Sequence, residues 1–408
     1  MRLLVVTQYY WPENFRINEV VYTLAQNGIT VEVLTGKPNY PHGKCFEGYK
    51  AWGCTREERH GVTAHRIPMV PRGKSAVGLI LNYLSFVLSG LFFGSFVLRK
   101  RSYDAIFVFA PSPILQAIPA IFLGWWKKIP VLLWVQDLWP ESLSATGYVK
   151  NSVLLKLIEY VVKGIYRGVD LLLVQSRAFI PQVRHLAGKT PVVYYPNSFI
   201  EWSLDSAYQI DCVGLKSHFS VLFAGNIGNA QAINIILEAA ETLKNVQDLS
   251  FVLVGDGSRR EWVKNEIQSR GLKNIFLPGS YPVEAMPSIM EQASVLLVTL
   301  ADTKIFRKTI PSKLQAYLAA GKPVLASLNG AGADLVLEAQ AGLVAPAEDA
   351  GALVEAILRL KGMSQEDRDV LGKNGRAYFL KHFSHEKLVK DLIQHIQSTI
   401  DQPRKGVL

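Results

Sequence analysis

The sequence is poor in cysteine: its 408 residues include three, Cys45, Cys54 and Cys212. Their spacing fits neither a disulfide framework nor a zinc site, both of which need several cysteines at recurring intervals. A secretory signal is not recognised either, because the apolar run Leu3–Val6 is short and leads directly into polar residues. These absences favour a reducing, cytoplasmic setting.

Acidic residues are scarce in the first half of the chain. Residues 1–200 contain 22 Lys and Arg against 11 Asp and Glu, whereas residues 201–408 contain 22 and 23, so the net charge of +10 comes from the first half. A basic half suggests an anionic surface as partner, either phospholipid or nucleic acid, although a soluble basic protein needs neither. Nucleic acid is the weaker alternative, because no helix-turn-helix, zinc or stacking-sheet signature accompanies the charge.

Strands and helices are expected to alternate, which is typical of an α/β protein with parallel sheets covered on both faces. The strands expected in the first half are Leu3–Thr7, Thr30–Leu34, Ala105–Phe109, Val131–Val135 and Leu171–Val174, and the helices include Arg16–Gln26, Pro113–Trp126 and Val153–Arg167. After Asn197 the strands expected are Ser220–Phe223, Phe251–Val254, Ile275–Leu277, Val295–Val298 and Val324–Ala326, and the helices lie near Ala232–Lys244, Arg260–Arg270, Glu284–Gln292 and Ser312–Ala320. This order predicts two successive doubly wound domains with a boundary near Pro196–Lys216, followed by two terminal helices, Gln365–His382 and His385–Ile400.

The segment Leu79–Leu98 is an apolar stretch followed by Arg99, Lys100 and Arg101, a length and flank that match a membrane span. Polar and small residues interrupt it, however, and a core strand of the same domain follows at once. A crossing would therefore divide one sheet between the two sides of a membrane. A buried core helix and a surface helix that dips into the bilayer both fit better.

Candidate site residues are those directly after each strand, because ligands bind beyond the carboxyl ends of parallel strands. Glu13, Asn14 and Arg16 follow the first strand and lead into a helix, whose N-terminus and arginine favour an anion. Asn39 and Tyr40 follow the second strand. Ordinary surface turns would explain the same residues without a function.

Asp137 and Trp139 follow the strand Val131–Val135. A carboxylate and an aromatic ring at a strand end suit acid–base chemistry or stacking on a sugar. The alternative is a helix start at Pro140, with Glu141 placed favourably for the helix dipole.

Two glycine-containing turns follow neighbouring strands of the second domain and lead into helices. Glycine lets the backbone approach a ligand, and the helix N-terminus behind it favours an anion. Two such turns at one sheet edge indicate a nucleotide cleft. The candidate donor-binding residues are Gly225, Asn226, Gly228, Gln231, Gly255, Asp256 and Gly257.

A basic segment, Lys304–Gln315, opens the helix that ends near Ala320. Pro311 and Ser312 form a good helix start. The helix dipole, together with Arg307, Lys308 or Lys313, is expected to hold a diphosphate, although a solvated charge run would need no ligand.

The runs GNIGNAQ, VGDGSR and IPSKLQAYLAAGKPVLA resemble the donor-binding domain of retaining family 4 glycosyltransferases with the GT-B fold. In the first half, YYWPENFR, TGKPNYPHGK and VQDLWPESLSATG are similar to a bacterial subgroup that contains O-antigen L-fucosamine transferases and colanic-acid glycosyltransferases. The resemblance extends over nearly the whole chain.

This resemblance implies two facing Rossmann-like domains joined by a C-terminal crossover helix. Residues 1–196, with the helix 385–402 packing back on them, would face the membrane and a polyprenyl-diphosphate-linked saccharide acceptor. Residues 217–384 would bind the nucleotide sugar. The protein would then be cytoplasmic, peripherally attached to the inner face of the bacterial inner membrane, with no metal or other cofactor required.

The resemblance also implies roles for particular residues. Lys313, with Arg307 or Lys308, would neutralise the diphosphate. Gln315 would contact the ribose, in place of the glutamate that many relatives carry there. Asp137 and Glu13 would orient the acceptor or the sugar. Asn226 and Gln231 stand where many relatives have Arg and Lys, and Gln136 where they have His. Retention is thought to need no covalent enzyme intermediate in this family. The leaving diphosphate would itself take the acceptor proton while cations stabilise it.

Within the subgroup, the UDP form of N-acetyl-L-fucosamine is the first choice of donor, and GDP-fucose or another UDP-N-acetylhexosamine comes next. Two other functions use the same fold. A nucleotide-sugar 2-epimerase would need no lipid acceptor and would leave the one-sided basic charge unexplained. A non-catalytic membrane scaffold would fit the glutamine at position 315.

Overall fold

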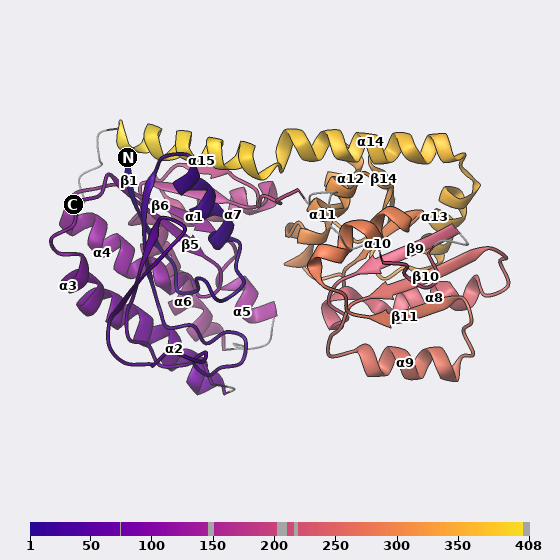
Figure 1. The fold of residues 1–408 in the computed structure, drawn as a ribbon, viewed down its shortest axis with the longest axis horizontal. Helices are drawn as coiled ribbons and strands as arrows, with labels where there is room; N and C mark the ends of the chain where they lie inside the picture. The colour runs from indigo at the N-terminus through magenta and orange to yellow at the C-terminus, as the bar shows by residue number, and fades with distance from the viewer. Residues whose placement is uncertain (74, 146–150, 202–209, 216–218, 403–408) are drawn as a thin grey trace. The chain divides into compact units, whose positions relative to one another are not determined.

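The computed structural model describes residues 1–73, 75–145, 151–201, 210–215 and 219–402 (Figure 1). The chain divides into two compact units, Met1–Pro196 with Leu388–Leu408, and Asn197–Lys387. We call them unit 1 and unit 2. Within the predicted boundary segment 196–216, residues 202–209 and 216 lie outside the described residues.

Unit 1 contains an eight-stranded sheet in the order β3-β4-β2-β1-β5-β6-β7-β8, parallel except for β3. Its strands are β1 (Arg2–Val6), β2 (Thr30–Thr35), β3 (Thr55–Arg59), β4 (Val62–Arg66), β5 (Ala105–Ala110), β6 (Val131–Val135), β7 (Leu171–Val174) and β8 (Val192–Tyr194). Its helices are α1 (Ile17–Gln26), α2 (Ala76–Ser89), the π-helix η1 (Gly90–Gly94), α3 (Ser95–Leu98), the 3₁₀-helix η2 (Ile114–Gln116), α4 (Ala117–Lys127), α5 (Glu141–Ala145), α6 (Ser152–Arg167), the 3₁₀-helix η3 (Arg177–Phe179), α7 (Ile180–Ala187) and α15 (His385–Ile400).

Unit 2 contains a six-stranded parallel sheet in the order β11-β10-β9-β12-β13-β14. Its strands are β9 (Phe219–Ala224), β10 (Leu249–Val254), β11 (Ile275–Gly279), β12 (Val295–Thr299), β13 (Val324–Ser327) and β14 (Gly342–Ala345). Its helices are η4 (Asn229–Gln231), α8 (Ile233–Thr242), α9 (Arg260–Ser269), η5 (Val283–Ala285), α10 (Met286–Gln292), η6 (Phe306–Lys308), α11 (Ser312–Ala320), α12 (Ala331–Glu338), α13 (Ala350–Gly362) and α14 (Gln365–His382), of which η4, η5 and η6 are 3₁₀-helices.

The strands are apolar on both sides because helices cover both faces of each sheet. In β9, for example, Leu222 packs in one core cluster with α11 and α14, whereas Phe223 packs in the other with α8 and α13. Strand order in each sheet reverses beside its first strand, between β1 and β5 in unit 1 and between β9 and β12 in unit 2. This is the position at which doubly wound sheets bind ligands.

The last helix, α15, belongs to unit 1 although it is last in the sequence. From Leu388 onward its apolar side joins the core formed by α1 and the first strands. The Tyr195 hydroxyl donates to the Leu388 carbonyl at 2.8 Å, which fixes the helix to the end of β8. The two Rossmann-like sheets and the crossover helix expected from the sequence are therefore confirmed.

The sequence analysis missed the β3–β4 hairpin at the edge of the unit 1 sheet. Strand β3 reads Thr-Arg-Glu-Glu-Arg and is exposed along most of its length. Its sequence does not alternate between apolar and polar residues, because an exposed edge strand with charged side chains buries little apolar surface. The strand is recognised in the structure by its antiparallel pairing with β4.

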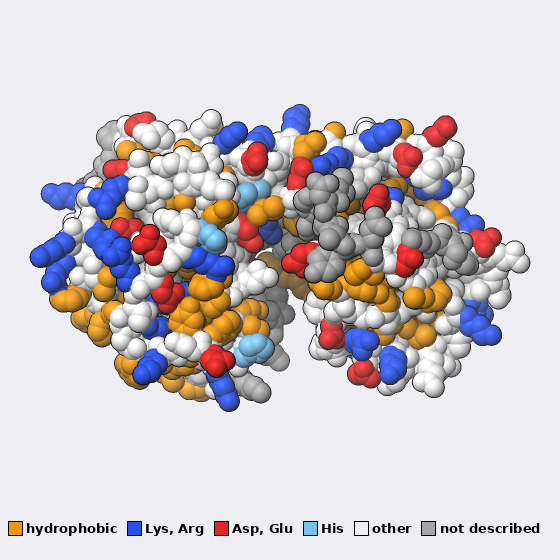
Figure 2. Space-filling model, in the orientation of Figure 1, with side chains coloured by type: hydrophobic (Ala, Val, Ile, Leu, Met, Phe, Trp, Pro, Cys, Tyr) orange, Lys and Arg blue, Asp and Glu red, His pale blue; other side chains and the backbone are white. Residues whose placement is uncertain are grey.

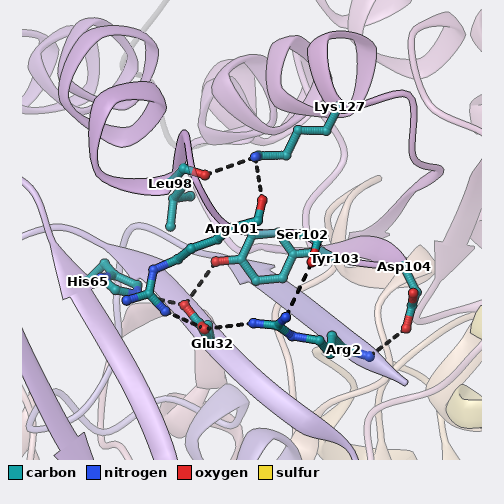
Figure 3. A network of polar contacts seen from close by, with 9 residues as sticks. All are labelled: Arg2, Glu32, His65, Leu98, Arg101, Ser102, Tyr103, Asp104 and Lys127. Atoms are coloured by element: carbon teal, nitrogen blue, oxygen red, sulfur yellow. Dashed lines mark hydrogen bonds and ion pairs between the residues drawn. The ribbon is translucent and has the colours of Figure 1, made fainter.

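A polar network fixes the ends of α3 and α4 to the sheet (Figure 3). The buried Glu32 carboxylate on β2 accepts hydrogen bonds from Arg101 at 2.6 Å and from the Tyr103 hydroxyl at 2.9 Å. The Lys127 ammonium donates to the carbonyls of Leu98 and Arg101, at 2.9 and 2.7 Å. The carboxyl ends of α3 and α4 are thereby held side by side.

Candidate functional site

The two glycine turns of unit 2 pack directly on each other. Gly225 donates its backbone N–H to the Val254 carbonyl at 2.8 Å, and Ile227 donates to the Asp256 carbonyl at the same distance. A Cβ on Gly255 would lie 1.9 Å from the Gly225 carbonyl oxygen, so no side chain fits there. The turns after β9 and β10 therefore form one surface of closely spaced backbone.

Lys313, in the first turn of α11, lies against this surface. A Cβ on Gly225 would be 2.6 Å from Lys313 Cε, so glycine leaves the space that the lysine stem occupies. The Lys313 ammonium lies 3.5 Å above the centre of the Phe223 ring and has no hydrogen-bond partner. Burial lowers the pKa of Lys313 to about 7. A phosphate bound beside the two glycine turns would give this buried ammonium the anionic partner that it lacks, and would favour its protonated form.

Gln315 and Tyr317, further along α11, fix the helix to its surroundings. The Gln315 amide nitrogen donates to the Asn197 carbonyl at 3.0 Å, while its buried Oε1 has no partner and could accept from a ligand hydroxyl. The Tyr317 hydroxyl accepts from the Ala224 N–H at 3.0 Å, which sets the end of β9 against α11.

The other predicted cations of unit 2 are arranged differently. Arg307 forms a two-pronged pair with Asp302, with both hydrogen bonds at 2.6 Å, and its side chain is mostly exposed. Lys308 is half-buried in the same 3₁₀-helix, η6, and Ser312 is exposed at the start of α11. Asn226 donates weakly to Gln231 at 3.4 Å, within the first glycine turn. Of the three predicted diphosphate cations, Lys313 is therefore the one set against the glycine turns.

In unit 1, Glu13 holds together the loops that follow β1 and β2. Its Oε1 accepts from the backbone N–H groups of Asn39 and Tyr40, at 2.8 and 2.7 Å, and its Oε2 accepts from Tyr10 at 3.3 Å. The side chain is 2% exposed, and burial raises its pKa to about 7. Both oxygens accept from backbone N–H groups, so Glu13 is a positioning residue in this structure, and its expected role of orienting the acceptor or the sugar stays a prediction.

The loops that Glu13 joins carry an aromatic cluster. The rings of Tyr9 and Phe15 stack with centroids 4.9 Å apart, and Tyr40 lies 5.3 Å from Phe15. Asn39 is fully buried and accepts from the Arg72 N–H at 2.9 Å. Glu13 therefore supports the geometry of this aromatic cluster at the carboxyl edge of the sheet.

Replacing Glu13 with alanine is expected to lower the free energy of unfolding by about 2–4 kcal/mol, because three backbone N–H groups would lose their acceptor. Urea denaturation monitored by circular dichroism measures the effect. Glu19→Ala, on the neighbouring helix, is the control and is expected to change stability by less than about 1 kcal/mol. Equal effects of the two substitutions would contradict the positioning role.

Asp137 and Trp139 form a second group in unit 1, beside Ser112. The Trp139 indole donates to the Ser112 hydroxyl at 3.2 Å. Burial raises the pKa of Asp137, although a hydrogen bond from the Ser112 backbone opposes the shift. Of the remaining candidates, Asn14 is exposed, and Arg16 is half-buried near Glu19 and Tyr195.

Sequence reasoning missed several residues that arrange these sites: Asp302, Tyr317, Asn197 and Ser112. The partners of Tyr317, Asn197 and Ser112 are distant in the sequence, so no local pattern marks these three residues. Asp302 pairs with Arg307 within one loop segment, at a spacing that no regular element predicts. A separate pocket of about 320 Å³ lies between the β3–β4 hairpin and Tyr10 and Trp11, and none of the predicted site residues lines it. Among the residues that the structure describes, no group of His, Cys, Asp or Glu is placed to hold a metal ion.

Two doubly wound parallel-sheet domains with a crossover helix define the GT-B class of fold, and solved glycosyltransferase structures confirm it. Sucrose-phosphate synthase from Thermosynechococcus elongatus superposes with a TM-score of 0.74 at 18% identity, covering 97% of this chain and 98% of that protein. HepE from Anabaena, in complex with UDP and glucose, gives a TM-score of 0.66 at 14% identity and covers 98% and 100%.

Each half of the sequence also matches a family of its own. Residues 14–198 match the glycosyl transferase 4-like domain, and residues 215–378 match glycosyl transferases group 1. The chain is therefore built from two glycosyltransferase domains. Among curated proteins, it is 26% identical over 352 residues to WcaI of Escherichia coli K12, named as a colanic acid biosynthesis glycosyl transferase, covering 79% of this chain and 82% of that protein.

Proposed function

We propose that the protein transfers a sugar, with retention of configuration, from a nucleotide-sugar donor to a polyprenyl-diphosphate-linked saccharide. Unit 2 holds the donor, and unit 1 holds the acceptor. The reaction serves bacterial surface-polysaccharide synthesis at the cytoplasmic face of the inner membrane. The name of the E. coli relative supports the polysaccharide assignment.

The observation that carries the proposal is the unpaired Lys313 ammonium against the two glycine turns. In the transfer step, the bond between the anomeric carbon and a diphosphate oxygen breaks, and the acceptor oxygen bonds to that carbon. The acceptor proton passes to the leaving phosphate. Negative charge builds up on the diphosphate, where Lys313 and the N-terminus of α11 stabilise it without a metal ion.

The same geometry suggests how the nucleoside is held. The partnerless Gln315 Oε1 is available to a ribose hydroxyl, which donates a weaker hydrogen bond to an amide oxygen than to a carboxylate. The donor we favour is the UDP form of N-acetyl-L-fucosamine, followed by GDP-fucose or another UDP-N-acetylhexosamine.

Calorimetric titration with UDP and then GDP tests the donor site, and transfer of radiolabelled sugar from each candidate donor to a membrane lipid extract tests the reaction. We expect UDP to bind and its N-acetylhexosamine form to label a lipid-soluble product. Preference for GDP would change the donor but keep the reaction. Isomerisation of free nucleotide sugar without acceptor would identify an epimerase, and binding of neither nucleotide would refute an enzymatic role.

A further inference from the structure

In the α2–η1–α3 helix, large apolar side chains face solvent and polar side chains face the protein, which is the opposite of the arrangement expected in a soluble protein. Its large apolar side chains recur every three or four residues on the solvent side, with Ile80 56% and Phe92 73% exposed. Figure 2 shows hydrophobic side chains gathered over this part of unit 1, at its lower left. The exposed apolar residues of this helix are Val77, Ile80, Leu81, Leu84, Leu88, Phe92, Phe93 and Phe96.

The polar and small residues of the same helix face the protein. Asn82 is fully buried, where it accepts from the Gln8 amide at 2.7 Å and donates to the Val70 carbonyl at 2.6 Å. A Cβ on Gly90 would lie 2.7 Å from Pro119, and one on Gly94 would lie 3.0 Å from Leu34. The helix is long and apolar enough to cross a membrane, but these contacts hold it along the surface of unit 1.

Two further helices extend this surface. Helix α4 contacts both α2 and η1 on one side and α6 on the other, so the three helices form one layer. On α4, Phe122, Trp125 and Trp126 are exposed. On α6 the exposed apolar residues are Val153, Leu154, Leu157 and Tyr160, the last 75% exposed. We call the outward side of α2–η1–α3, α4 and α6 the apolar face.

The charges around the apolar face are almost all positive. Arg99 and Lys100 follow α3, and Lys128 ends α4 beside them, where Lys127 joins the two helix ends. Across 76–98, 117–127 and 152–167, all of which the structure describes, Glu159 is the one acidic residue. Trp125 and Trp126 lie next to this basic rim, as aromatic rings do at a membrane–water interface.

We propose that the apolar face docks unit 1 on the surface of a lipid bilayer that carries anionic headgroups. The apolar side chains enter the outer part of the bilayer, while the basic rim contacts lipid phosphates. A second copy of the chain fits less well, because its own basic rim would meet this one. The proposal deepens the proposed function, on whose lipid-linked acceptor it rests, by naming the surface that brings the enzyme to it.

Flotation of the full-length protein with lipid vesicles tests the proposal. Vesicles contain either phosphatidylcholine alone or equal parts of phosphatidylcholine and phosphatidylglycerol. We expect Leu84→Glu with Phe92→Glu to lower binding to the mixed vesicles more than about tenfold, because two apolar side chains can no longer enter the bilayer. Leu337→Glu, at a position 58% exposed in unit 2, is the matched control and should bind as the wild type does.

Charge is tested separately. Arg99→Glu with Lys100→Glu should reduce binding to the mixed vesicles several-fold but leave the weaker binding to phosphatidylcholine unchanged. Circular dichroism and UDP titration establish that each variant is folded with an intact donor site. Wild-type flotation of Leu84→Glu/Phe92→Glu would overturn the proposal, as would a wild-type dimer that this variant converts to monomer. Retained UDP binding in either case would leave the proposed function standing.

Discussion

Replacing Lys313 with methionine is expected to weaken UDP binding at least about tenfold and, at the same time, to stabilise the free protein. The first effect follows from losing a charge-assisted hydrogen bond to phosphate, which contributes about 1.5–3 kcal/mol. The second follows because a buried ammonium without a partner costs free energy, whereas methionine has a similar length and no charge. We expect the free energy of unfolding of the variant to rise by about 1 kcal/mol.

The protonation of Lys313 makes UDP binding depend on pH in a way that can be measured. With its pKa lowered to about 7, the free side chain is mostly neutral at pH 8, and a bound diphosphate restores the charge. UDP binding at pH 8 should therefore take up about one proton, and binding at pH 6 should take up almost none at this residue. UDP affinity should fall as the pH rises above 7.

The same pKa sets the sign of a stability effect. The unfolded chain binds the Lys313 proton more tightly than the folded chain does, so stability should rise with pH between about 7 and 10. Calorimetry in buffers of different ionisation enthalpy measures proton uptake, and urea denaturation measures stability. Both pH dependences should disappear in Lys313→Met. Lys304→Met, on the exposed part of the same basic segment, is the control.

If Lys304→Met also abolished the proton uptake on UDP binding and the pH dependence of stability, the general positive charge of the segment, and not Lys313 itself, would explain both. Proton uptake that persists unchanged in Lys313→Met would place the titrating group elsewhere, on the nucleotide itself or on another side chain.

Replacing Gly255 with alanine is expected to destabilise unit 2 by about 3 kcal/mol or more and to abolish nucleotide binding. Its φ of 139° lies in a region that residues with a side chain rarely adopt, and the new Cβ would stand 1.9 Å from the Gly225 carbonyl oxygen. Relief of that contact would separate the two glycine turns. Lys313 would then lose the backbone surface against which it lies.

Gly271→Ala provides the matched control. Gly271 also has a positive φ, of 60°, but nothing lies within 4 Å of the position of its Cβ. Backbone strain alone should cost this variant about 1 kcal/mol and leave UDP affinity unchanged. Urea denaturation and UDP titration of both variants make the comparison. If Gly255→Ala bound UDP as tightly as Gly271→Ala, close packing of the two turns would not be required for the donor site.

Local sequence patterns predicted the central strands of both sheets and the helices between them, but they missed the β3–β4 hairpin, β8 and β14. Continuous apolar runs such as Ala105–Phe109 and Val131–Val135 predicted strands buried on both faces, and their alternation with helices predicted two doubly wound domains. The sequence also predicted the glycine turns and the basic start of α11. A backbone that closely approaches a ligand needs glycine, and anion binding at a helix N-terminus is favoured by nearby basic residues. The carboxyl edges of the strands then indicated which loops to examine.

The roles of individual side chains depend on contacts that form only in the folded protein. Lys313, Arg307 and Lys308 are equivalent in the sequence, yet Asp302 engages Arg307, while Lys313 is buried against Phe223 without a partner. Glu13 is expected from the sequence to orient the acceptor or the sugar, whereas in the structure its two oxygens accept from three backbone N–H groups. The sequence of Leu79–Leu98 is compatible with a membrane span, a buried core helix or a surface helix. In the structure, the close contacts of Gly90 and the hydrogen bonds of Asn82 identify the side of the helix that packs inward. Burial and many polar contacts depend on groups far apart in the chain, such as Gln315 and Asn197, and even the near pair Asp302 and Arg307 is set by the conformation of its loop.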